Sequence, residues 1–198
     1  MIIGVLAIQK GYAKHIKMLS RQGFFCIKIK HRGDLANVQG LVIPHGNLST
    51  LLYRLHALGF ADEIARRAKH KKHPLVLFGL GSGAAVLAKK LITASEYKSL
   101  GIVDMVVTEG LSARLKPIQK DVHIDGIMAP MLVTLWPSLA ITSAGKHVET
   151  IALYQQKEIV GVRSDTVFAT LFDPVDAFNL HVLFGMTVAM KTDLADYL

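Results

Sequence analysis

The chain has 198 residues, of which 51% are hydrophobic, and this is enough apolar material for one α/β domain spanning residues 1–198. Only 19% of the residues are charged, which excludes a disordered or fibrous protein because the apolar surface can offset the entropy lost on folding. The formal net charge of +8 favours acidic partners. Basic residues gather in two clusters, Lys28, Lys30, His31 and Arg32, and Arg66, Arg67, Lys69, Lys71 and Lys72.

Neither basic cluster is interleaved with aromatic residues or set in a nucleic-acid-binding motif, so a solvated surface is favoured over a nucleic-acid site.

Cys26 is the only cysteine, which excludes an intramolecular disulfide. The apolar start has no basic region before it, so a cytoplasmic location is expected. Prolines and hydroxyl residues interrupt the uncharged stretch 126–145, which therefore predicts strands and turns and no membrane span.

Apolar periodicity predicts alternating strands and helices from the first residues onward. The expected strands are 2–8, 24–29, 41–43, 74–78, 103–108, 139–143, 150–154 and 158–163. The expected helices are 12–21, 49–59, 61–72, 83–91 and 173–190. This alternation predicts a mostly parallel sheet between helices, with ligands beyond the carboxyl ends of the strands.

The middles of three proposed central strands should form a dry core. Its expected members are Val5, Leu6, Val42, Ile43, Val76 and Leu77. The turns after Ile43, Phe78 and Val162 are the ones expected to carry a site.

The turn Gly79-Leu80-Gly81-Ser82-Gly83 joins a strand to a helix through small residues, as in an elbow that exposes a nucleophile above a sheet. The segment 74–90 resembles the stretch in the glutaminase subunit of pyridoxal 5'-phosphate synthase (the PdxT/SNO family) where a strand leads to Gly-Thr-Cys-Ala-Gly and a helix ending in Ala-Lys. Gly79 and Ala88-Lys89 match without a gap, which places Gly81 at the nucleophile position.

Further segments support this resemblance along most of the chain. Residues 4–9 are similar to the family's opening Gly-Val-Leu-Ala-Leu-Gln, 40–44 to its Gly-Leu-Val-Leu-Pro strand, and 100–104 to its Leu-Gly-Leu-Met-Asp. His45-Gly46-Asn47 then corresponds to Gly-Gly-Glu, and Arg114 aligns with an arginine of a substrate-side loop. The resemblance implies a flavodoxin-like three-layer α/β/α class I glutamine amidotransferase fold.

Near the C-terminus, residues 159–167 are aligned with the family's strand ending in Gly-Cys-Ser-Phe-His-Pro-Glu, so that Asp165 replaces the histidine and Val167 the glutamate. The family uses a cysteine thiolate, a histidine and a glutamate to hydrolyse glutamine and passes the ammonia to a synthase subunit. A glycine supplies no nucleophile, aspartate lacks an imidazole, and valine accepts no hydrogen bond. The resemblance therefore implies a degenerate triad at Gly81, Asp165 and Val167.

His45, Gly46, Asn47, Ser82 and Arg114 are the expected oxyanion or substrate-pocket positions. The sequence predicts a non-hydrolytic relative that acts as a binding or regulatory protein, with a synthase-like subunit or a small polar ligand as partner.

An active glutaminase subunit, a serine hydrolase using Ser82, and an anion-binding module are the alternatives. Ser82 lacks the outer glycines of Gly-x-Ser-x-Gly, Cys26 is read as a buried strand residue, and the nine histidines show no metal-ligand spacing. No cofactor or metal is expected.

Overall fold

The fold was analysed in a computed structural model, which describes residues 1–110, 116–125, 127 and 130–174. The helices are α1 (Tyr12–Arg21), η1 (Arg32–Asn37), α2 (Leu48–Ala57), α3 (Phe60–Ala68) and α4 (Ser82–Ala85). The first strands are β1 (Ile2–Leu6), β2 (Phe25–Ile29), β3 (Gly40–Ile43), β4 (Val76–Leu80), β5 (Ala88–Ile92) and β6 (Val103–Glu109). The later strands are β7 (Ile118–Ile124), β8 (Met131–Leu135), β9 (Leu139–Ala144), β10 (Glu149–Tyr154), β11 (Glu158–Ser164), β12 (Val167–Thr170) and β13 (Phe172–Pro174).

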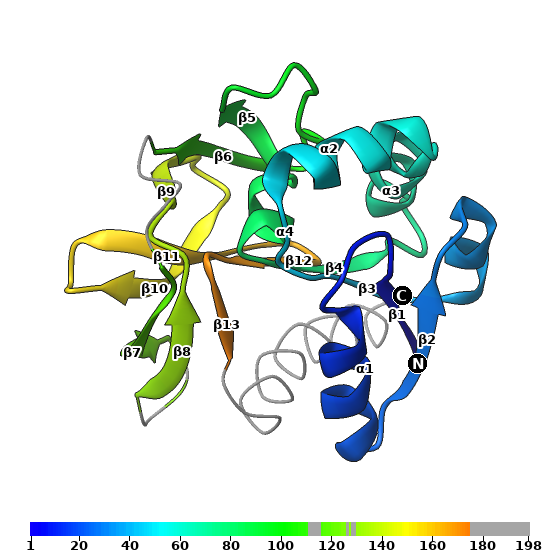
Figure 1. The fold of residues 1–198 in the computed structure, drawn as a ribbon, viewed down its shortest axis with the longest axis horizontal. Coiled ribbons are helices and arrows are strands. Elements are labelled where there is room, and N and C mark those ends of the chain that lie inside the picture. Colours follow the sequence, from blue (N-terminus) through cyan, green and yellow to red (C-terminus); the bar gives the residue numbers. More distant parts are fainter. Residues whose placement is uncertain (111–115, 126, 128–129, 175–198) are drawn as a thin grey trace.

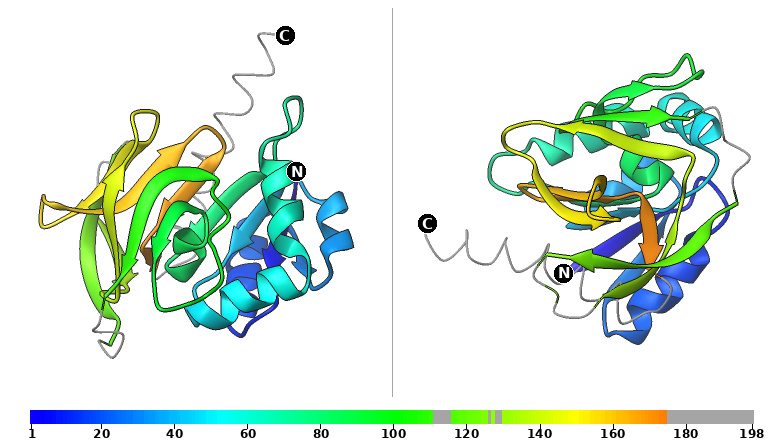
Figure 2. Two further views of the ribbon diagram at one scale, coloured as in Figure 1. Left: turned by 90° about the horizontal axis from the view of Figure 1, so that it is seen from above. Right: turned by 90° about the vertical axis from the view of Figure 1, so that its left-hand side faces the viewer.

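The strands β2-β1-β3-β4-β12 form the parallel centre of the sheet, with α1 on one face and α2 and α3 on the other (Figure 1). This arrangement confirms the expected flavodoxin-like α/β fold. Antiparallel strands β7 to β11 extend the sheet on the side away from these helices (Figure 2).

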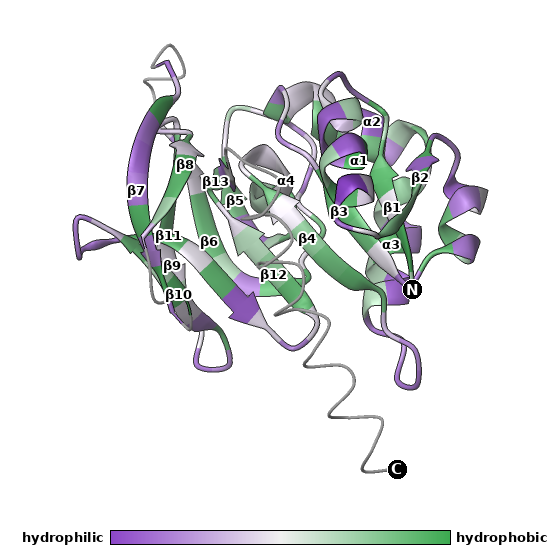
Figure 3. Ribbon diagram, turned by 90° about the horizontal axis from the view of Figure 1, so that it is seen from below, coloured by the Kyte–Doolittle hydropathy of each residue, from purple (hydrophilic) through white to green (hydrophobic). Residues whose placement is uncertain are grey.

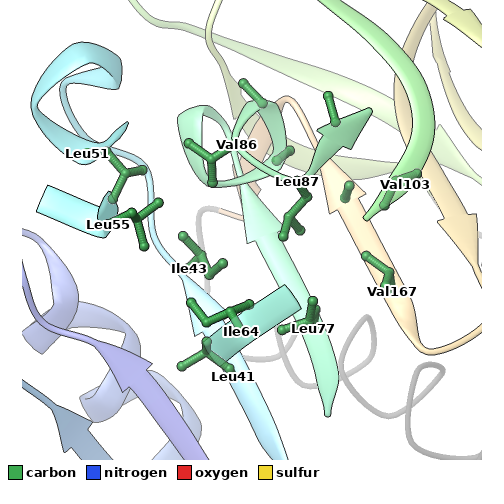
Figure 4. Packing of buried hydrophobic residues seen from close by; sticks show 14 of the residues in the cluster. Leu41, Ile43, Leu51, Leu55, Ile64, Leu77, Val86, Leu87, Val103 and Val167 are labelled. Carbon is green, nitrogen blue, oxygen red and sulfur yellow. The ribbon is translucent and has the colours of Figure 1, made fainter. Parts of the chain in front are cut away.

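The core lies on both faces of the parallel strands, because successive side chains of a strand point in opposite directions. Leu41, Ile43 and Leu77 pack with Leu51 and Leu55 of α2 and Ile64 of α3 (Figure 4). Val5, Val42 and Phe78 pack on the opposite face. The six residues expected to form the dry core are all no more than 2% exposed, so that prediction is confirmed. Colouring by hydropathy shows apolar central strands beside helices with polar outer sides (Figure 3).

The helix expected over 83–91 is wrong. Helix α4 ends at Ala85, and the chain continues as β5, which pairs parallel with β6. The carbonyls of Val86 and Leu87, which a longer helix would use internally, instead accept hydrogen bonds from the backbone of residues 100, 102 and 103. Tertiary pairing thus overrides the local helical preference.

The helix expected from Asp173 does not begin there, because Asp173 and Pro174 belong to β13, paired antiparallel with β8. Residues 175–190 lie outside the described part of the chain. Strand β7 was not expected from the sequence, whereas β8 lies in the stretch 126–145 for which strands and turns were predicted. Strand β8 alternates buried and less buried side chains, as an antiparallel strand does.

Candidate functional site at the elbow after strand β4

Gly81 forms a sharp elbow between β4 and α4, as predicted. Its φ of 54° and ψ of −115° are strained for an L-residue but accessible to glycine. The Gly81 N–H donates to the carbonyl of Thr170 on β12 at 2.7 Å, and the Gly81 carbonyl accepts from the N–H of Ala84 and Ala85. The turn is therefore held on both sides without any side chain at Gly81.

Two stacked rings lie against the elbow. His45, just beyond β3, stacks on Trp136, just beyond β8, with ring centroids 3.5 Å apart and planes 8° from parallel. A Cβ atom at Gly81 would lie 2.9 Å from His45 Cγ and 2.8 Å from Trp136 Cδ1, closer than van der Waals contact allows. The rings thus occupy the space that a nucleophilic side chain at this position requires.

The backbone donors around the elbow are already engaged within the chain. The N–H of Ser82 donates to His45 Nδ1 at 3.1 Å, and the N–H of Gly46 donates to Ser82 Oγ at 2.8 Å. These are the two N–H groups that an elbow of this kind offers to an oxyanion. A substrate oxygen can reach them only after His45 and Ser82 have moved.

Ser82 is 1% exposed, and its hydroxyl donates to the carbonyl of Gly46 at 3.0 Å. A nucleophilic serine must instead direct its proton to a base. Ser82 therefore links the elbow to the loop after β3, and this geometry does not favour the serine-hydrolase alternative.

Asn47, expected in the substrate pocket, is the N-cap of α2. Its Oδ1 accepts from the Thr50 N–H at 2.9 Å, and its own backbone N–H and carbonyl are held by the Gln9 amide, each at 2.9 Å. These bonds fix the loop that carries His45 and Gly46. Arg114, the other expected pocket residue, lies outside the described residues.

The expectation that Asp165 lies at the same end of the sheet as Gly81 is wrong. Strand β12 runs parallel to β4, with Val167 opposite Leu77 and Thr170 opposite Leu80. Asp165 precedes β12 and therefore lies at the amino end of β4, where it lines a cavity with Lys69 and His70. The physical reason is that β11 pairs antiparallel with β12, so its carboxyl end points away from the elbow.

The residues that follow β12 do reach the elbow end of the sheet. Asp173 is 6% exposed, and its carboxylate contacts His15 Nε2 at 3.2 Å and Lys14 Nζ at 3.0 Å, both on α1. Burial alone would raise the pKa of Asp173, but the His15 hydrogen bond and the charges of His15 and Lys14 outweigh it and hold the pKa below its usual value. Asp173 was not among the site residues predicted from the sequence.

Comparison with known proteins decides the family. The family model described as SNO glutamine amidotransferase family matches residues 5–188. The chain belongs to this family. Among its relatives is a "Pyridoxal 5'-phosphate synthase subunit PdxT" of Corynebacterium glutamicum (strain ATCC 13032), 32% identical over 98% of this chain and 100% of the relative. A protein of the same name from Brevibacillus brevis is 31% identical over 88% of this chain and 89% of the relative.

Solved structures agree with this fold. A crystal structure titled as a glutamine amidotransferase has a TM-score of 0.83 at 24% identity and covers 94% of this chain and 99% of its own. The structure of PurLQS from Thermotoga maritima has a TM-score of 0.66 at 16% identity, covering 87% of this chain and 86% of its own.

The sequence around Asp173 is similar to the family's Phe-His-Pro-Glu segment. Phe172-Asp173-Pro174-Val175 keeps the phenylalanine and proline of the Phe-His-Pro-Glu segment that the sequence alignment had set against residues around Asp165. Phe172 and Pro174 are the residues that match the family's segment, whereas Asp173 stands where the family has histidine. Val175 lies outside the described residues.

Cys26 and the metal-ligating residue types give little support for a second site. Burial raises the pKa of the Cys26 thiol, and a hydrogen bond with Ser20 offsets this only in part, so the thiol stays protonated. Within the described ranges, no group of three or more His, Cys, Asp or Glu residues is arranged to hold a metal ion. The same ranges contain no helix long and apolar enough to cross a membrane.

His45 is uncharged at neutral pH. Burial lowers its pKa to about 4, although the negative charge of Asp173 acts in the opposite direction. Because Nδ1 accepts the Ser82 N–H, the ring hydrogen belongs on Nε2. Protonation of Nδ1 would replace this acceptor with a second donor and break the contact.

The depressed pKa of His45 predicts a pH-dependent stability. The unfolded chain, with a histidine pKa near the ordinary 6.5, binds more protons than the native state between about pH 6.5 and 4, so stability falls as pH drops through this window. Between pH 7 and 5 we expect a loss on the order of 1–2 kcal/mol from this group. Urea unfolding of wild type and His45→Phe at several pH values measures it.

His45→Phe should flatten this part of the pH profile, whereas replacement of the exposed His147 by phenylalanine should leave the profile unchanged. Equal pH dependence in wild type and His45→Phe would contradict the assignment.

Proposed function

We propose that this protein is a non-hydrolytic member of the SNO glutamine amidotransferase family that acts as a binding or regulatory protein. The observation that carries the proposal is the elbow itself. Gly81 has no side chain, and the stacked rings of His45 and Trp136 fill the space in which one would lie. Glutamine hydrolysis through a covalent intermediate requires a nucleophile at such an elbow.

The proton-transfer group is also changed. We place Asp173 at the position of the family's histidine, because it follows β12 at the elbow end of the sheet and keeps the neighbouring Phe172 and Pro174. Its carboxylate is paired with His15 and Lys14, which favours the ionised form. An ionised carboxylate that is paired with Lys14 and hydrogen-bonded to His15 cannot protonate departing ammonia as an imidazolium does.

The names of the relatives suggest a partner for a binding or regulatory protein. The relatives are named as subunits of pyridoxal 5'-phosphate synthase, so we propose a synthase-like subunit as the partner and the cytoplasm as the location. A small polar ligand in the degenerate cleft would have to displace His45 from the Ser82 N–H. An active glutaminase subunit, the alternative, would need a nucleophile other than residue 81.

We expect the purified protein to release no ammonia from glutamine, alone or with a candidate synthase subunit. Ammonia release by the Corynebacterium glutamicum relative, assayed at equal concentration, provides the positive control. Association with the synthase subunit is measured separately by sedimentation velocity, so a binding role is tested independently of turnover.

Turnover by the wild type would overturn the proposal. If Ser82→Ala abolished that turnover, the serine alternative would gain support. If Ser82→Ala left it intact, the reaction would take place at another site. If the protein neither hydrolyses glutamine nor associates with the synthase subunit, the absence of hydrolysis is confirmed. The proposed partner is then wrong.

A further inference from the structure

A pocket distinct from the elbow lies at the carboxyl ends of β1 and β2, beside α2. Its volume is about 430 Å³, which falls within the range of small-molecule sites. Its lining includes Ile8, Lys30, His31, Tyr53, Arg54 and Leu58. In parallel α/β sheets, ligands are commonly bound beyond this edge of the strands.

The lining residues that carry full charge are cations drawn from two separate elements. Lys30 follows β2, whereas Arg54 comes from α2, and the Arg54 guanidinium donates to the carbonyl of Ile8. The backbone N–H groups of Lys30 and His31 both donate to Asp34 Oδ2 at 2.9 Å, which fixes the loop carrying them. Asp34 is the acidic group bonded to this loop, and its carboxylate is engaged by these backbone donors.

The fold thus separates the first basic cluster of the sequence. Lys28 lies over the ring of Tyr12 on α1, with Nζ 5.9 Å from the ring centroid, and does not line the pocket. Lys30 and His31 instead line the pocket together with Arg54, a residue that is distant in sequence and outside the cluster. Two cations from separate elements that line one pocket favour a ligand with more than one negative charge.

The rest of the lining is apolar or aromatic. Ile8 is 6% exposed, whereas Tyr53 and Leu58 are 51% and 50% exposed, and the Tyr53 ring also contacts Tyr97 edge-on at a centroid distance of 5.6 Å. An exposed aromatic ring beside cations suits a ligand that has both an anionic and a planar apolar part.

We propose that this pocket binds a small phosphate monoester carrying an aromatic group. The phosphate dianion lies between Lys30 and Arg54, with His31 at its edge, and the organic group packs on Tyr53 and Leu58. The pocket is independent of the elbow and does not depend on whether the protein hydrolyses glutamine. Its volume of about 430 Å³ favours a small molecule over a nucleic-acid strand.

Binding is tested by titrating ¹⁵N-labelled full-length protein with phenyl phosphate, inorganic phosphate, benzyl alcohol and a short single-stranded oligonucleotide, while amide chemical shifts are followed. We expect phenyl phosphate to shift the amides of Lys30, His31 and Arg54 and to bind more tightly than inorganic phosphate, and benzyl alcohol to bind weakly. Rising salt should weaken the binding of phenyl phosphate. Tighter binding of the oligonucleotide or of benzyl alcohol would overturn the proposal.

Lys30→Gln should weaken phenyl phosphate binding about tenfold, as expected for loss of one charge-assisted contact. Lys28→Gln is the matched control, since it removes the same charge two residues away outside the pocket. Tyr53→Ala should weaken phenyl phosphate and leave inorganic phosphate unchanged. Lys30 and Lys28 are both exposed, so neither substitution disturbs the core. Equal weakening by Lys28→Gln and Lys30→Gln would show non-specific charge attraction and contradict the proposal.

Discussion

Gly81→Cys is expected to destabilise the protein by roughly 3–5 kcal/mol and to yield no glutaminase. Two costs add. A cysteine must adopt the elbow's positive φ, and its Cβ would overlap the stacked rings of His45 and Trp136. Urea unfolding monitored by circular dichroism measures the loss, and an ammonia assay tests for activity. Restoring the family's residue type at one position should therefore harm this protein.

Gly101→Cys is the matched control for Gly81→Cys. Gly101 also has a positive φ, of 65°, but no atom lies within 4 Å of the position of its Cβ. Its replacement should therefore cost only backbone strain, about 1–2 kcal/mol. His45→Gly should cost less stability in the Gly81→Cys background than in the Gly101→Cys background, because only residues in contact are coupled. If Gly81→Cys and Gly101→Cys lost equal stability, the rings would not fill the elbow.

Val76→Asp is expected to leave the protein unfolded at room temperature. Val76 is 0% exposed on β4, between β3 and β12, so the carboxylate would be buried without a partner. An unpaired buried charge costs several kcal/mol, which is comparable with the whole stability of a domain of this size. Circular dichroism and thermal unfolding provide the measurement.

Leu132→Asp provides the comparison for Val76→Asp, since Leu132 also lies on a strand but is 41% exposed. We expect this variant to remain folded with a change within about 1 kcal/mol. A Val76→Asp protein with unchanged thermal stability would refute the position of β4 in the centre of the sheet.

The amino-acid sequence by itself determined the parallel half of the fold. Helix α1 has the predicted bounds, and the buried centres of β1, β3 and β4 follow from continuous apolar runs, which are a local signal. The elbow at Gly81 was also predictable from the sequence, because a turn that requires a positive φ favours glycine. The family resemblance depended mainly on these segments.

The tertiary structure decided which residues meet at the elbow. The direction of β11 depends on its antiparallel pairing with β12, and the apolar periodicity of single strands does not show that this pairing carries Asp165 away from Gly81 and brings Asp173 towards it. The stack of His45 on Trp136 joins residues from two distant turns, and the contacts of Asp173 with Lys14 and His15 join β13 to α1. Such contacts depend on strand direction and register across the whole sheet, whereas periodicity reports only the faces of single elements.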